Sequence, residues 1–209
     1  MALTDKQLIA ELAGGKYQPV YLLMGEEDYY IDKVSDWMEE HIIDSGLRDF
    51  DQTVVYGRDV DMKTVVGHCK RFPMMSPVHL VMVKEAQGID KRQWEHLVPY
   101  LQQPSPQTVL VLCYRHGALD KRTGVYKAIA AAGVVYETPR VYDNQVPAWI
   151  KAEVSANGRT ISDKAAMMLS EFLGTDLGKT ANELSKLYPL VPEGGQIDEQ
   201  LVRLWQPRL

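Results

Sequence analysis

The chain has 209 residues, of which 45% are hydrophobic and 24% charged, so a sizeable core is possible and disorder is not the expectation. Its net charge of −5 argues against a main nucleic-acid surface that binds by charge alone. Cys69 and Cys113 form neither a disulfide framework nor a metal-ligand spacing. No apolar run approaches the ~20 residues of a membrane span, and the amphipathic, partly acidic N-terminus is not a signal peptide. We therefore expect a cytoplasmic protein without membrane contact.

Short apolar strands alternate with helical patterns from the N-terminus to Pro139. Thr4 is placed to cap a first helix that ends at Gly14. The strands are expected at residues 19–24, 50–56, 78–83, 108–114 and 134–137. The intervening helices are expected at residues 28–42, from about 60 to before Pro73, at 90–98 with Pro99 ending or kinking the helix, and at 120–132. This alternation predicts a parallel, five-stranded α/β sandwich covered by helices on both faces.

The pattern changes after Pro139, where helical signals continue and strand signals are absent. Four helices are expected, around Trp149, from Ser162, from Asp176 and from Asp198. The sequence thus predicts an α/β domain at residues 1–141 and a small helical lid domain at 142–209. This order resembles that of AAA+ modules, at the level of fold alone.

The turn after the first strand is where a RecA-like α/β domain carries its phosphate-binding loop. Such a loop needs glycines, a lysine for the phosphate charge and a serine or threonine for Mg²⁺. Here the turn reads Gly25-Glu26-Glu27-Asp28, and its three carboxylates repel phosphate. We expect no functional P-loop, no cofactor and no intrinsic catalysis.

Other catalytic signatures are also missing from the sequence. No Gly-x-Gly-x-x-Gly follows the first strand, the five histidines show no metal-binding spacing, and no serine or cysteine lies in a nucleophile elbow. His79 falls within a strand pattern, where a structural role is the simpler interpretation. The alternative that stays open is an α/β nucleotide-binding enzyme with a degenerate P-loop or Rossmann-like motif, which ATP or GTP binding would reveal.

Several segments in a fixed order resemble the delta subunit of the bacterial DNA polymerase III clamp loader. The segments are Pro19 to Glu27 with Gly-Glu-Glu in place of a P-loop, Phe72-Pro73-Met74-Met75-Ser76 before a strand, Asp120-Lys121-Arg122 with Tyr126-Lys127, Trp149-Ile150, Gly158 to Ile161, and Asp176-Leu177 with Asn182 to Leu187. Each segment is weak evidence alone, and their order and spacing make the resemblance specific. Delta-prime-like scaffolds are disfavoured, because the zinc-binding cysteine cluster and Ser-Arg-Cys motif of those subunits do not occur here.

The resemblance implies a subunit that binds and opens the sliding clamp (beta) for loading onto primed DNA during replication. The subunit would have no ATPase activity of its own. It would belong to a DNA-directed DNA polymerase, which is a nucleotidyltransferase, only as a component of that complex. The implied partners are the clamp, the gamma/tau and delta-prime subunits, and DNA in the full assembly. Family members contact those subunits through a C-terminal collar, and this chain stops about where that collar should begin.

The resemblance also assigns the clamp-binding residues as Phe72, Pro73, Met74 and Met75, with methionines where the family usually has phenylalanines. Methionine is flexible and polarizable, which suits an adaptable binding pocket. The competing interpretation is a helix–strand connection whose methionines close the sheet edge, and Phe72 is expected to be the most core-like of the four. The basic side chains Lys70, Arg71, Lys121 and Arg122 are left unassigned, because solvated helix ends explain them equally well.

Overall fold

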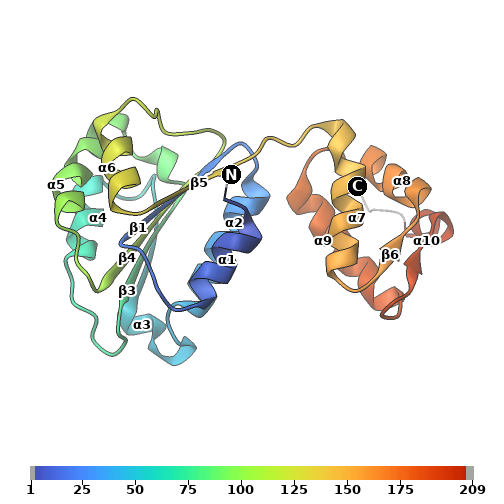
Figure 1. Ribbon diagram of the computed structural model, residues 1–209, viewed down its shortest axis with the longest axis horizontal. Coiled ribbons are helices and arrows are strands. Elements are labelled where there is room, and N and C mark those ends of the chain that lie inside the picture. Colours follow the sequence, from blue (N-terminus) through green and yellow to red (C-terminus); the bar gives the residue numbers. More distant parts are fainter. Residues whose placement is uncertain (1–2, 206–209) are drawn as a thin grey trace. The chain divides into compact units, whose positions relative to one another are not determined.

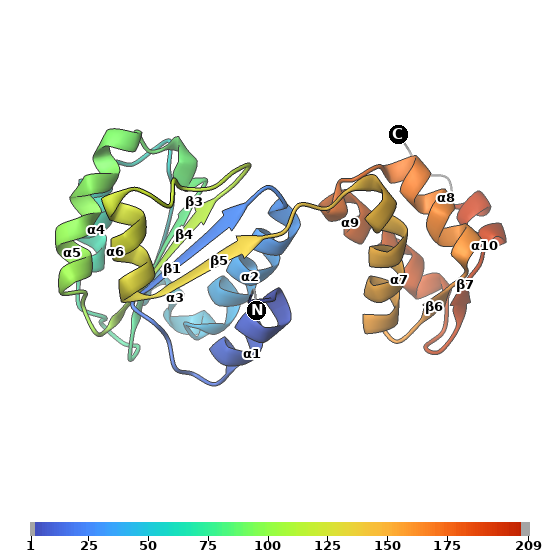
Figure 2. The same ribbon diagram turned by 45° about the horizontal axis from the view of Figure 1, so that its top comes forward.

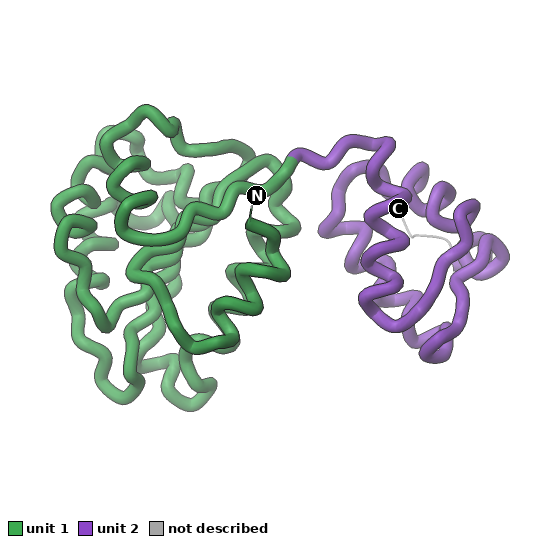
Figure 3. Tube along the Cα trace, in the orientation of Figure 1, with its two compact units in different colours: residues 1–139 green, residues 140–209 purple. Residues whose placement is uncertain are grey.

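The computed structural model describes residues 3–205. The chain forms two compact units, the first ending at Pro139 and the second beginning at Arg140 (Figure 3). Each is described by itself.

Unit 1 is built on a five-stranded parallel sheet with the order β2-β3-β4-β1-β5 (Figures 1 and 2). The strands are β1 Val20–Gly25, β2 Gln52–Tyr56, β3 His79–Lys84, β4 Thr108–Tyr114 and β5 Val134–Thr138. The first strand lies inside the sheet between β4 and β5, with Leu22 opposite Leu112 on one side and Val135 on the other. This confirms the predicted RecA-like α/β architecture.

Helices cover both faces of the sheet, so alternate residues of each inner strand enter different cores (Figure 2). The helices are α1 Asp5–Ala13, α2 Asp28–His41, α3 Arg48–Asp51, α4 Met62–Cys69, α5 Val98–Gln102 and α6 Gly124–Ala132. On one face, Leu23 packs in a core with residues of α1 and α2. On the other, Leu22 packs with residues of α4, α5 and α6. Both side chains are fully buried.

Several element boundaries in unit 1 differ from the expectation, and three of these differences have a clear local cause. The second strand begins at Gln52 and not at residue 50, because residues 48–51 close a helical turn. Residues 91–97 form a 3₁₀ helix, and Pro99 lies in the first turn of α5, where its missing N–H costs nothing. The helix expected from residue 120 starts at Gly124, because Thr123 provides the cap that accepts the Tyr126 N–H.

Unit 2 packs four helices, α7 Val146–Ala156, α8 Asp163–Leu173, α9 Leu177–Leu187 and α10 Glu199–Leu204. Ser162, Asp176 and Asp198 cap the last three, as their residue types predict. The expected absence of strands here is wrong. The unit also contains a pair of short parallel strands, β6 Thr160–Ile161 and β7 Gln196–Ile197. Strands of two residues are too short to show the alternation that identifies a strand in a sequence.

Candidate functional site

The connection between α4 and β3, residues 70–78, is here named the apolar loop. It lies at the amino-terminal edge of the sheet, because it leads into a parallel strand. Its ends are fixed by bonds to neighbouring segments. The Thr108 hydroxyl donates to the carbonyl of Cys69 at 2.9 Å, and the His79 N–H donates to the carbonyl of Gln107 at 2.7 Å.

The large apolar side chains of this loop point into solvent. Phe72, Met74 and Met75 are 79%, 73% and 64% exposed, and Pro73 is half-buried. The expectation that Phe72 is the most core-like of the four is therefore wrong, since its ring is the most exposed of the three. Solvation of three neighbouring large apolar side chains is costly, and such patches mark interaction surfaces.

A buried carboxylate lies beneath this exposed surface. Asp51, at the end of α3, is fully buried, and it accepts hydrogen bonds from three consecutive backbone N–H groups of the loop. The donors are Met74 at 2.5 Å, Met75 at 2.7 Å and Ser76 at 2.6 Å. Burial alone would raise the pKa of Asp51, but the three N–H groups outweigh it and hold the pKa below its usual value.

Sequence reasoning missed Asp51, because it assigned residues 50–56 to a strand. The sequence does contain one signal for it, because Asp51 directly precedes a strand, where a buried side chain is expected and an acidic one is unusual. Nothing in the local sequence indicates which donors compensate its charge.

The opposite, carboxyl edge of the sheet is where nucleotides bind in open α/β folds. Only Glu26 and Glu27 separate the end of β1 from the start of α2, so the turn is too short for a phosphate-wrapping loop. Glu27 caps α2, and its carboxylate accepts the Tyr29 N–H at 3.4 Å. The helix N-terminus that would face a phosphate thus carries its own carboxylates.

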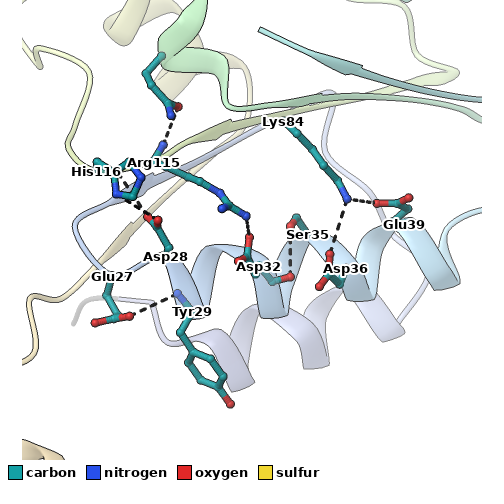
Figure 4. A network of polar contacts seen from close by, with 11 residues as sticks. Glu27, Asp28, Tyr29, Asp32, Ser35, Asp36, Glu39, Lys84, Arg115 and His116 are labelled. Carbon is teal, nitrogen blue, oxygen red and sulfur yellow. Dashed lines mark hydrogen bonds and ion pairs between the residues drawn. The ribbon is translucent and has the colours of Figure 1, made fainter. Parts of the chain in front are cut away.

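Carboxylates along α2 contact basic side chains at this edge (Figure 4). His116 lies 3.1 Å from Asp28, and Arg115 forms an ion pair with Asp32. Burial raises the pKa of Asp32 despite the guanidinium beside it.

Further along α2, Lys84 at the end of β3 lies 2.6 Å from Glu39 and 3.8 Å from Asp36. Burial would lower the pKa of Lys84, but the hydrogen bond and charge of Glu39 raise it overall. Arg115 and Lys84 are therefore each paired with carboxylates of α2.

Neither cysteine nor metal chemistry is indicated in the part of the chain that the structure describes. Cys69 and Cys113 are buried free thiols, and burial raises the pKa of each to about 12. Among residues 3–205, no group of three metal-ligating side chains converges. No helix in that range is both long enough and apolar enough to cross a bilayer.

The sheet order and the helical unit that follows it in the chain define an AAA+-like fold with a RecA-like α/β domain, in which carboxylates occupy the position of the phosphate loop. The sequence profile described as "DNA polymerase III, delta subunit" matches residues 21–138, more than half of the chain. The chain belongs to the DNA polymerase III delta subunit family.

Individual similar proteins include a delta subunit and solved structures that share the fold. The chain is 25% identical over 194 residues to the DNA polymerase III subunit delta of Bacillus subtilis, covering 89% of this chain and 56% of that protein. It thus spans a little over half of this relative's length. In structure it is similar to the B. subtilis DNA clamp loader delta protein, with a TM-score of 0.79, 23% identity and coverage of 99% and 63% of the two chains. A RuvB variant of Thermotoga maritima shares the fold, with a TM-score of 0.50, 16% identity and coverage of 94% and 64%.

Proposed function

We propose that this chain binds the sliding clamp through the apolar loop and holds the ring open while it is loaded onto primed DNA. The observation that carries the proposal is the exposure of Phe72, Met74 and Met75 on a loop whose backbone is anchored from beneath. Hot spots at interfaces are a few large side chains that become fully desolvated in a partner's pocket. Pro73 would restrict the loop between Phe72 and Met74, which reduces the entropy lost on binding.

The proposed role is mechanical rather than catalytic. Binding energy from the loop would shift the clamp toward its open ring, because a ligand shifts an equilibrium by its differential affinity for the two states. The carboxylates at the opposite edge of the sheet support a subunit that uses no ATP of its own. In the complete clamp loader it would work beside gamma/tau and delta-prime subunits on DNA, as an accessory component of the polymerase.

The test combines a binding and an opening measurement with the purified chain and the sliding clamp of the same organism. We expect saturable binding by the wild-type chain and faster release of clamps from circular DNA without ATP. The variant Met74→Asp, Met75→Asp should lose both activities, because a buried unpaired carboxylate is strongly disfavoured in an apolar pocket. Met167→Asp, at an exposed methionine of α8, is the matched control and should keep both.

Three outcomes would count against the proposal. Absence of clamp binding by a well-folded wild-type chain would refute it. Equal loss of binding in both methionine variants would place the interface elsewhere. Saturable ATP or GTP binding would favour the alternative of a degenerate nucleotide-binding enzyme.

A further inference from the structure

We propose that Asp51 is a positioning residue, whose carboxylate fixes the backbone of the apolar loop so that Met74 and Met75 project outward. The inference deepens the proposed clamp-binding function and rests on it. In this role, a buried side chain sets the orientation of exposed side chains.

The geometry of the hydrogen bonds supports this role. Asp51 Oδ1 accepts the N–H of Met74, and Oδ2 accepts the N–H groups of Met75 and Ser76. Consecutive N–H groups that converge on one anion form a concave nest, and here the protein supplies the anion itself. With their N–H groups directed to the buried carboxylate, Met74 and Met75 carry side chains that are mostly in solvent.

The loop needs such an anchor because its side chains favour another arrangement. Exposed Phe and Met side chains gain free energy by folding back onto nearby apolar surface. Hydrogen bonds to an ionised carboxylate are about twice as strong as those between neutral groups, so they resist this collapse. Bonds to residues 69 and 79 secure the loop ends independently, so removal of the anchor should loosen the tip alone.

The carboxylate and the loop come from separate elements. Asp51 lies 23 to 25 residues before its donors, on the segment that leads into the edge strand β2. Burying a carboxylate at this position is costly, and a buried uncharged residue would avoid that cost. The carboxylate is therefore best explained by the hydrogen bonds with which it holds the loop. Retaining the carboxylate gives the loop one defined conformation before the partner arrives, which limits the ordering cost of binding.

The first experiment measures the loop directly, without the clamp. In the wild-type chain, amide hydrogen exchange at Met74, Met75 and Ser76 should be slow despite their exposed position. Asp51→Asn keeps one oxygen but directs an NH₂ group at a donor, so exchange at these amides should accelerate at least about tenfold. Exchange in β3 and β4 should stay slow. Exchange at unprotected rates in the wild-type chain would overturn the inference without any variant.

The second experiment measures affinity for the sliding clamp. Asp51→Asn should weaken binding by roughly 10- to 100-fold, because the methionines must be ordered at the moment of binding. Asp61→Asn is the matched control. This substitution makes the same isosteric change in the carboxylate that caps the N-terminus of α4, at the end of the helix away from the apolar loop. The variant should bind the clamp as the wild type does.

A double-mutant cycle separates positioning from a general structural effect. In a Met74→Ala, Met75→Ala background, Asp51→Asn should cause little further loss of affinity, since the side chains that it positions are gone. An equal loss in both backgrounds would overturn the inference. If the wild-type chain does not bind the clamp, the proposed function fails, whereas the exchange experiment still decides whether Asp51 holds the loop.

Discussion

The backbones of Gly25 and Gly117 pair through two hydrogen bonds, from Gly25 N–H at 2.8 Å and from Gly117 N–H at 3.0 Å. The pair ties the end of β1 to the segment that follows β4. Gly25 also lies against Thr138 of β5, whose hydroxyl accepts the Glu27 N–H at 3.1 Å. The turn that a phosphate-binding loop would occupy is therefore held by hydrogen bonds to the segment after β4 on one side and to β5 on the other.

We predict that the chain binds no ATP at micromolar concentrations. The carboxylates of Glu26, Glu27 and Asp28 repel phosphate, and Arg115 and Lys84 are already engaged by carboxylates of α2. Isothermal titration calorimetry with Mg-ATP should give no saturable signal. Saturable binding that is lost when the 26–28 turn is mutated would contradict this prediction.

Gly25→Ala should destabilise unit 1 by about 2–4 kcal/mol. Gly25 has a φ of +141°, and a β-carbon there would lie 2.0 Å from Thr138 Oγ1 and 2.8 Å from its backbone nitrogen. Gly67→Ala in α4 is the control, because a β-carbon there would meet no atom within 4 Å apart from its chain neighbours and the backbone of its own helix, and alanine should stabilise by about 0.5–1 kcal/mol. Urea unfolding of the three proteins measures both effects, and equal stabilities would contradict the close packing at Gly25.

Met74→Ala, Met75→Ala should weaken clamp binding by roughly 100- to 4,000-fold, because full burial of each methionine contributes about 1.5–3 kcal/mol. The melting temperature should barely change, since both side chains are exposed in the free protein. Met82→Ala, at a fully buried methionine of β3, should instead cost about 2–5 kcal/mol of stability. A well-folded double variant that binds at full strength would end the hypothesis.

The stability of unit 1 should fall as the pH decreases below about 6.5, in part through His79. Burial lowers the pKa of this imidazole. The charge of Asp51 opposes this shift, and the charge of Arg71 adds to it. The unfolded chain then binds more protons than the folded chain below the ordinary histidine pKa. The stabilisation is fully present above that pH and is lost as the pH falls.

His79→Gln should reduce this pH dependence, because glutamine does not titrate and has an amide group to replace the 3.1 Å contact of Nε2 with Thr53 Oγ1. Some dependence should remain, since burial also lowers the pKa of His68. Urea unfolding from pH 5 to 7 provides the measurement. His41→Gln, at an exposed imidazole of α2, controls for the loss of a histidine. Unchanged pH dependence in His79→Gln would exclude the buried imidazole as a contributor.

Features that depend on local chemistry could be read from the sequence. Alternation of apolar strands with helices predicted the parallel sheet, and Thr4, Ser162 and Asp176 cap their helices as their side chains dictate. The missing phosphate loop was also readable, because phosphate binding requires particular residue types at one turn. The apolar segment was found through resemblance, since no periodicity distinguishes an exposed methionine from a buried one.

Tertiary structure alone decided how those features are held. The exposure of Phe72 depends on what packs around the loop, and the role of Asp51 depends on N–H groups more than twenty residues away. The pairing of Gly25 with Gly117 joins segments that are distant in sequence. Hydrogen bonds between backbone groups and remote partners leave no local pattern, because every residue except proline carries the same N–H and C=O. The sequence thus indicated which segment could bind a partner, and the fold determined the conformation in which that segment is presented.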